Sequence, residues 1–110
     1  MIIINYSKAI YRILKTIDIE FDKGTQTSDI FDLEKLDISY RRLCIILKGL
    51  YDDGYIDGID FIPILGSDIP DFKLIGCHLT ISGMIYLEDN TTMKNAYKLL
   101  KEAKEWIPGL

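Results

Sequence analysis

The stretch that most constrains the fold is ISYRRLCIILKGLYDDGYIDGI, which covers residues 38–59. Ser39 can cap a helix there, and Ile38 and Leu43 bracket this cap as a hydrophobic staple. An apolar stripe recurs at helical spacing and consists of Leu43, Ile46, Leu47 and Leu50. Gly54 stops the helix, because glycine takes the left-handed backbone conformation without steric cost, and an alternating, strand-like pattern follows. This succession predicts the core of a helix-turn-helix with a β-wing.

Two helices are expected before this stretch. Asn5 can cap a first helix that starts at Tyr6 and ends at Lys23–Gly24. Its apolar stripe consists of Tyr6, Ile10, Ile13, Leu14, Ile17 and Phe21. Ser28 can cap a short second helix, and Asp29 in its first turn favours the helix dipole. The apolar contacts of this second helix are expected from Ile30, Phe31, Leu33 and Leu36.

Two strands and two further helices are expected after residue 59. Pro63 cannot donate to a β-ladder, so the first strand is edge-like or ends there, and a turn-rich loop over residues 66–71 leads to a second strand over residues 72–79. Thr80 can cap the next helix, in which Gly83 permits a close approach to another element. A last amphipathic helix follows, with its apolar face formed by Met93, Ala96, Tyr97, Leu100 and Ala103.

The predicted fold is therefore α+β. We expect one winged helix-turn-helix domain over residues 1–110, in the order helix, helix, helix, strand, strand, helix, helix, with a two-stranded wing. The last helix packs on its own domain or on a twin, so a homodimer through the C-terminal helix is a further expectation.

Composition excludes several classes of protein. The longest apolar runs are four residues and no basic stretch with an apolar successor opens the chain, so we expect no membrane span, no signal peptide and a cytoplasmic location. Cys44 and Cys77 are the only cysteines and are expected to be core or half-buried thiols. Adjacent Cys77 and His78 diverge on a strand, so we expect no metal site. Without a phosphate-binding glycine loop or a nucleophile–base pair, we expect no cofactor and no catalysis.

The net charge of −4 is unevenly distributed along the chain. Residues 1–48 carry a net charge of +1, residues 49–72 carry −6 without any basic residue, and residues 73–110 carry +1. The negative charge is thus concentrated in the region where the wing is expected.

Several motifs resemble the YjcQ family. They are Asn5-Tyr6 with Ile10 to Lys15, Leu50 to Gly58, and Leu79-Thr80-x-x-Gly83-x-x-Tyr86-Leu87-Glu88-Asp89-Asn90 with the following Met93. The resemblance covers nearly the whole chain, and the order of its motifs is fairly specific. It implies a winged-helix fold and a phage or prophage setting in Gram-positive bacteria, and it carries over no catalytic or ligand-binding residue.

The first functional hypothesis is a regulatory protein that binds double-stranded DNA. A helix-turn-helix reads base edges with the N-terminal residues of its second helix, and the third helix here offers Arg41, Arg42 and Lys48. Positive charge in the first turn opposes the helix dipole, so the two arginines are better contact candidates than arbitrary surface arginines. Lys8 and Arg12 would add phosphate contacts from the first helix. The alternative is two solvated arginines paired with Asp37 or Glu34.

The second hypothesis is a module that binds a host protein, for example to disable nucleic-acid machinery. Ile45 lies in the middle of the supposed reading face, and an apolar centre with an arginine rim is common in protein interfaces. Asp68 and Asp71 belong to an acidic wing that would repel phosphates. Alternatively, Met1–Ile4 covers Ile45. A continuous basic strip joining Lys8, Arg12, Arg41 and Lys48 would favour DNA, whereas scattered charges would favour a protein partner.

Overall fold

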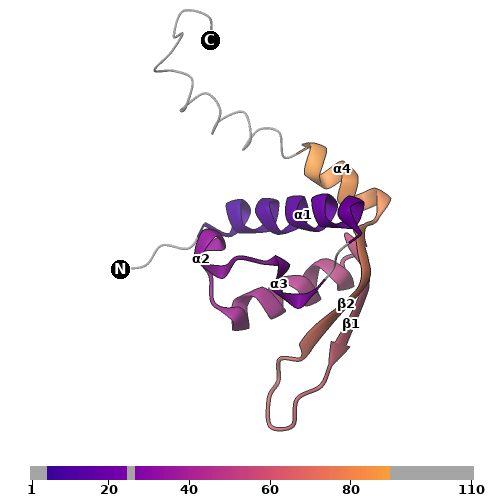
Figure 1. The fold of residues 1–110 in the computed structure, drawn as a ribbon. Coiled ribbons are helices and arrows are strands. Elements are labelled where there is room, and N and C mark those ends of the chain that lie inside the picture. Colours follow the sequence, from indigo (N-terminus) through magenta and orange to yellow (C-terminus); the bar gives the residue numbers. More distant parts are fainter. Residues whose placement is uncertain (1–4, 25–26, 90–110) are drawn as a thin grey trace, which may run out of the picture.

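The structure is a computed structural model that describes residues 5–24 and 27–89. The elements are α1 (Tyr6–Lys23), the 3-10 turn η1 (Ser28–Ile30), α2 (Leu33–Leu36), α3 (Tyr40–Asp52), β1 (Ile56–Ile62), β2 (Asp71–Leu79) and α4 (Ile81–Asp89). This is an α+β arrangement in which β1 and β2 form a two-stranded antiparallel sheet (Figure 1). The expected last helix and its dimerisation role lie outside the described residues.

The bounds of α1 are those that the sequence predicted. Oδ1 of Asn5 accepts the backbone N–H of Lys8 at 3.0 Å, and the helix ends at Gly24. Its buried residues are Ala9, Ile13, Leu14 and Ile17. The two ends of the predicted stripe are wrong, because Tyr6 and Phe21 are about half exposed. A helix of 18 residues spans about 27 Å and extends past the core at both ends.

The second helix differs from the prediction in its start and its length. Ser28 begins a 3-10 turn, and only the single turn of α2 is α-helical. Asp32 is the cap of α2, since its Oδ1 accepts the N–H groups of Glu34 and Lys35 at 3.1 and 3.2 Å. A carboxylate satisfies two free helix donors at once and also favours the dipole, which explains why the helix begins at this later cap. The expected apolar contacts are correct, with Phe31 and Leu36 buried.

The bounds of α3 agree with the prediction. Oγ of Ser39 accepts the N–H of Arg42 at 3.2 Å, and the buried residues are Leu43, Cys44, Leu47 and Leu50. At the other end Gly54 has a φ of +81°, and the N–H of Tyr55 donates to the Leu50 carbonyl at 2.8 Å. The N–H of Gly54 donates to the Tyr51 carbonyl at 3.0 Å, which completes a Schellman motif.

The two strands form a ribbon whose loop projects away from the helices (Figure 1). β1 ends at Ile62, directly before Pro63, as predicted, and β2 begins one residue earlier than predicted. Phe61 pairs with Phe72, but the register shifts between Asp57 and Ile59. At this bulge a Cβ on Gly58 would overlap the carbonyl oxygen of Gly76, so the two strands can approach only through glycine.

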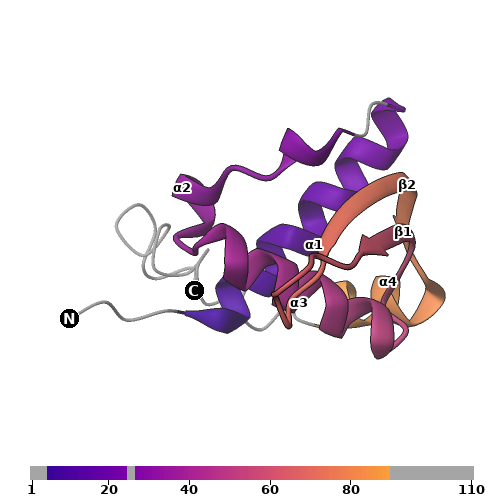
Figure 2. The same ribbon diagram turned by 90° about the horizontal axis from the view of Figure 1, so that it is seen from below.

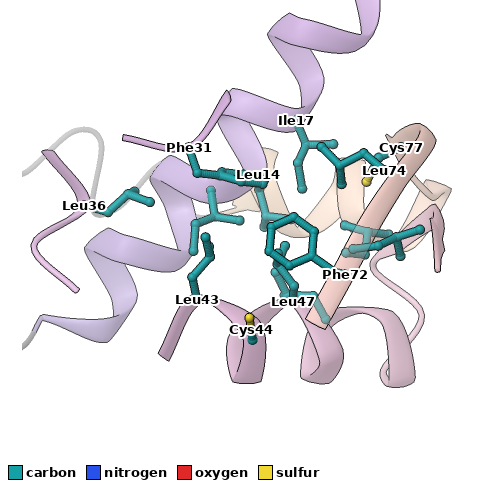
Figure 3. Packing of buried hydrophobic residues seen from close by; sticks show 14 of the residues in the cluster. Leu14, Ile17, Phe31, Leu36, Leu43, Cys44, Leu47, Phe72, Leu74 and Cys77 are labelled. Carbon is teal, nitrogen blue, oxygen red and sulfur yellow. The ribbon is translucent and has the colours of Figure 1, made fainter. Parts of the chain in front are cut away.

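One hydrophobic core joins α1, α3 and β2. Figure 3 shows Leu14 and Ile17 of α1 packed toward Leu43 and Leu47 of α3 and Phe72 of β2. Both cysteines are buried in this core, as predicted for the thiols. Burial, aided by the negative charge of Asp57, raises the pKa of the Cys77 thiol to about 12. Cys77 is therefore an uncharged core residue at neutral pH.

α4 is fixed against the junction between α3 and β1. Oγ1 of Thr80 accepts the N–H of Gly83 at 3.1 Å, which confirms the predicted cap, and the Thr80 N–H donates to the Tyr55 carbonyl at 3.0 Å. Gly83 is buried, and a Cβ there would overlap the same Tyr55 oxygen. The close approach predicted for Gly83 is thus confirmed. Within the described part of the chain, no helix is both long and apolar enough to cross a bilayer.

Candidate interaction surface

The outer face of α3 brings together residues from both functional hypotheses. α3 lies beneath α1 in Figure 1, and Figure 2 is the view from below, onto the side of α3 that is turned away from α1. Arg41, Ile45, Lys48 and Asp52 recur at helical spacing on the exposed face of α3, opposite its buried residues. Ile45 is 51% exposed at the centre of the group. The outer face therefore has an apolar centre with charged ends.

Lys48 already has partners within the chain. Its Nζ lies 2.7 Å from Oδ1 of Asp52, one turn further along α3. The same Nζ lies 5.2 Å from the ring centroid of Phe61 on β1 and 5.8 Å from that of Tyr51. These are cation–π distances, so the ammonium group links α3 to the wing. Lys48 is less available to a phosphate than its sequence position indicates.

The two arginines of the first turn differ from each other. Arg42 donates a hydrogen bond to the hydroxyl of Tyr6, and its guanidinium lies 5.8 Å from the centroid of that ring. No hydrogen bond or ion pair joins Arg41 to any residue that the structure describes, and Arg41 is exposed. Among the described residues, neither arginine pairs with Asp37 or Glu34, which the alternative interpretation required.

The predicted contacts on α1, Lys8 and Arg12, have surroundings of their own. Nη1 of Arg12 donates to the backbone carbonyl of Lys35 at 2.6 Å, which holds its guanidinium against α2. Lys8 is half-buried one turn earlier on the same helix. Arg12 contacts α2, Arg42 contacts Tyr6 and Lys48 contacts Asp52. Of the predicted DNA contacts, these three cations therefore each have a partner in a different part of the chain, whereas Arg41 has no hydrogen bond or ion pair to a described residue.

Asp71 connects the wing to the start of α3. It accepts a hydrogen bond from the Tyr40 hydroxyl and another from the Phe72 N–H at 2.8 Å. The Tyr40 ring also stacks on Phe72, with centroids 5.9 Å apart and planes inclined by 24°. The Tyr40 hydrogen bond, followed by that of Phe72, lowers the pKa of the Asp71 carboxyl. Burial, then the bond to Asp71, raises the pKa of the Tyr40 hydroxyl.

Sequence reasoning missed the apolar tip of the wing. Leu65 is fully exposed, and Ile62 and Ile64 are about half exposed around Pro63. The signal was present in the run Ile62-Pro63-Ile64-Leu65, because a proline that ends a strand leaves the next apolar residues without a sheet to pack on. Asp68 is exposed in the same loop.

The described residues contain no group of three or more His, Cys, Asp or Glu side chains that could hold a metal ion. His78 is half-buried, its Nδ1 lies 2.9 Å from the Gly76 carbonyl oxygen, and its ring centroid is 5.5 Å from that of Phe21. These contacts place the imidazole in a packing role.

The fold and this surface define a small α+β domain with a helical face and a β-ribbon available for contact. The model of the YjcQ protein family matches residues 11–106. The chain is 32% identical over 103 residues to a Bacillus subtilis (strain 168) protein named "Uncharacterized protein YjcQ", and the match covers 94% of this chain and 98% of that relative. The chain therefore belongs to the YjcQ family, and the resemblance is confirmed. No solved structure matches the chain.

Proposed function

We propose that this chain is a non-catalytic winged-helix module that binds a protein partner through the outer face of α3. The order of three helical segments followed by an antiparallel ribbon supports the winged-helix assignment. Ile45 carries the functional proposal, because it is a large aliphatic side chain, 51% exposed, at the centre of a face rimmed by charges. Protein interfaces concentrate their binding energy in apolar centres of this kind.

The placement of the cations favours a protein partner over DNA. A DNA-binding protein gains most of its non-specific affinity from lysines and arginines that neutralise phosphates. Here Lys48, Arg42 and Arg12 already contact groups of the chain itself. The wing, which would lie close to the duplex, carries Asp57, Asp60 and Asp68 as exposed acids. A role as a phage or prophage inhibitor of host machinery belongs to this proposal and is supported only by the family resemblance and the acidic wing.

The experiment compares partner capture by matched variants. The immobilised chain and its Ile45→Asp variant are incubated with Bacillus subtilis lysate, and bound proteins are quantified by mass spectrometry. The matched control is Ile75→Asp, because Ile75 is 52% exposed on β2, outside the α3 face. We expect Ile45→Asp to lose the specific partners by about tenfold or more, as for a central interface residue, while the control retains them. Equal retention by the three proteins would overturn the proposal.

DNA binding is a second candidate because of one observation. Arg41 is exposed and unpaired among the described residues, and it lies beside Arg42 in the first turn of α3, the part of a helix-turn-helix that reads bases. The test is fluorescence anisotropy with a random duplex, titrated with salt. Under this candidate, replacing both arginines by alanine lowers the affinity and reduces the salt slope by up to about two. Absence of binding at low salt would exclude it.

A further inference from the structure

A groove with a basic rim lies between α1 and the η1–α2 segment. Its volume is about 580 Å³, within the range of about 300–1,000 Å³ that is usual for binding clefts. The apolar side chains that line it are Tyr11, Ile19, Ile30 and Leu36, and the basic ones are Arg12, Lys15, Lys23 and Lys35. Leu36 is buried and Ile30 is half-buried, whereas Lys15, Lys23 and Lys35 are exposed, so the groove offers apolar contact at its floor and positive charge at its edges.

The acids of the groove do not neutralise this charge. Among the described residues that line the groove, Glu20 and Asp32 are the acids beside the four basic residues, which leaves a net charge of +2. Glu20 lies 3.5 Å from Nζ of Lys23, and Asp32 is held at the N-terminus of α2 as its cap. Lys15 and Lys35 are exposed and form no ion pair with another described residue. A ligand for this groove should be acidic and should carry apolar side chains.

The wing of the same chain has these two properties. Residues 57–71 contain four acids and no basic residue. The connecting loop presents the fully exposed Leu65, with Ile64 beside it, and Asp68 three residues further on. In Figure 1 this loop lies at the far end of the ribbon from α1 and α2. The wing loop is thus directed away from its own groove and is accessible to another molecule.

The loop is also held in one shape before any contact is made. The N–H of Ser67 donates to the Ile64 carbonyl at 3.0 Å, and Oγ of Ser67 bonds both the N–H and the carbonyl of Ile69, at 3.2 and 3.1 Å. Pro63 and Pro70 restrict the backbone on either side. A preorganised loop loses less conformational entropy on binding than a flexible one.

We infer that the basic groove between α1 and α2 binds the acidic wing loop of a second copy of this chain. Leu65 and Ile64 would meet the apolar floor while Asp60 and Asp68 approach Lys15 and Lys35 at the rim. If each copy offers its wing to the groove of the other, the contact closes as a two-fold dimer, and otherwise it grows into an open chain. The inference does not depend on the proposed function, because neither Ile45 nor Arg41 takes part.

The first test measures molar mass by sedimentation equilibrium over a range of protein and salt concentrations. We expect the mass to rise from 12.7 kDa with increasing protein concentration, and to fall back as salt screens the charges. A wild-type chain that remains monomeric at all concentrations in low salt would overturn the inference.

The decisive test reverses charges on each surface. Lys15→Glu with Lys35→Glu makes the groove acidic, and Asp60→Lys with Asp68→Lys makes the wing basic. Each variant alone should weaken self-association by about tenfold or more, because like charges then face each other. Mixed together, the two variants should associate again, because both groove–wing contacts regain opposite charges. A mixture that stays monomeric would contradict the inference.

Two controls separate this contact from others. Arg41→Glu with Arg42→Glu changes the net charge by the same amount as the groove variant, but on α3, and should leave self-association intact. Leu65→Asp changes only the fully exposed tip, where folding is not at risk, and should abolish it. Self-association that survives both Leu65→Asp and the groove variant would show that another surface holds the copies together. Ile45→Asp should leave the mass unchanged, so the two proposals can fail separately.

Discussion

The outer face of α3 and the groove between α1 and α2 are both basic when charges are counted along the sequence, but the structure uses them differently. On α3, Lys48 is held by Asp52 and Arg42 by Tyr6. Among the described residues, this leaves Arg41 as the unpaired cation of the helix, with the half-exposed apolar side chain of Ile45 one turn further along. In the groove, Lys15 and Lys35 stay exposed around an apolar floor. The comparison teaches that a cation in a sequence is available for binding only when its own fold leaves it without a partner.

The largest effect should separate the two sides of α3. Leu47→Ala removes a fully buried side chain from the core and should lower the free energy of unfolding by about 2–5 kcal/mol. Ile45→Ala, two residues earlier, should change it by less than about 0.5 kcal/mol, since Ile45 packs little in the isolated chain. Urea denaturation followed by circular dichroism measures both. Comparable losses for the two variants would mean that Ile45 is a packing residue, and the outer face would no longer be a free surface.

An intermediate effect on stability is expected from the cap of α2, the helix that lines one side of the groove. Asp32→Ala removes the cap of the single-turn α2 and should cost about 1 kcal/mol in the free energy of unfolding. Because α2 carries Lys35 and Leu36, the same variant should also weaken self-association. Asp29→Ala is the control, since Asp29 lies in η1 and caps no α-helix. If both variants have the same small effect, Asp32 does not hold the groove in shape.

The groove and the outer face also differ in how far the sequence could predict them. Local signals sufficed for α3, because the Ser39 cap, the apolar stripe and Gly54 are all encoded within the helix and its ends. The groove depends on where α2 begins, and there Ser28 and Asp32 are both permitted caps. Only the structure shows that Asp32 is the cap that is used, because its carboxylate accepts the N–H groups of both Glu34 and Lys35.

The sequence also could not predict which groups the polar and charged side chains contact. Arg12 and Lys35 are 23 residues apart, Arg42 and Tyr6 are 36 apart, and Tyr40 and Asp71 are 31 apart. Spacing rules reach only three or four residues along a helix, so they can indicate a contact such as Lys48–Asp52 but not these three. Asp71, which the sequence places among the acids of the predicted protein-binding wing, forms hydrogen bonds that link the wing to α3.

The smallest expected effect concerns the contribution of Asp71 to stability, which should depend on pH. The folded-state pKa of Asp71 is lowered from 3.8, so the ionised carboxylate stabilises the fold above that value, and this contribution is lost as the pH falls through the lowered pKa. Asp71→Asn should therefore have a lower urea midpoint than the wild type at neutral pH, and the difference should shrink below pH 3.8. Tyr40→Phe removes the donor from the same pair and should show the same convergence. Asp68→Asn is the control, because Asp68 is exposed and no described residue hydrogen-bonds its side chain, so this variant should leave the urea midpoint at neutral pH close to that of the wild type. A pH-independent difference for Asp71→Asn would mean that the carboxylate charge does not hold the wing against α3.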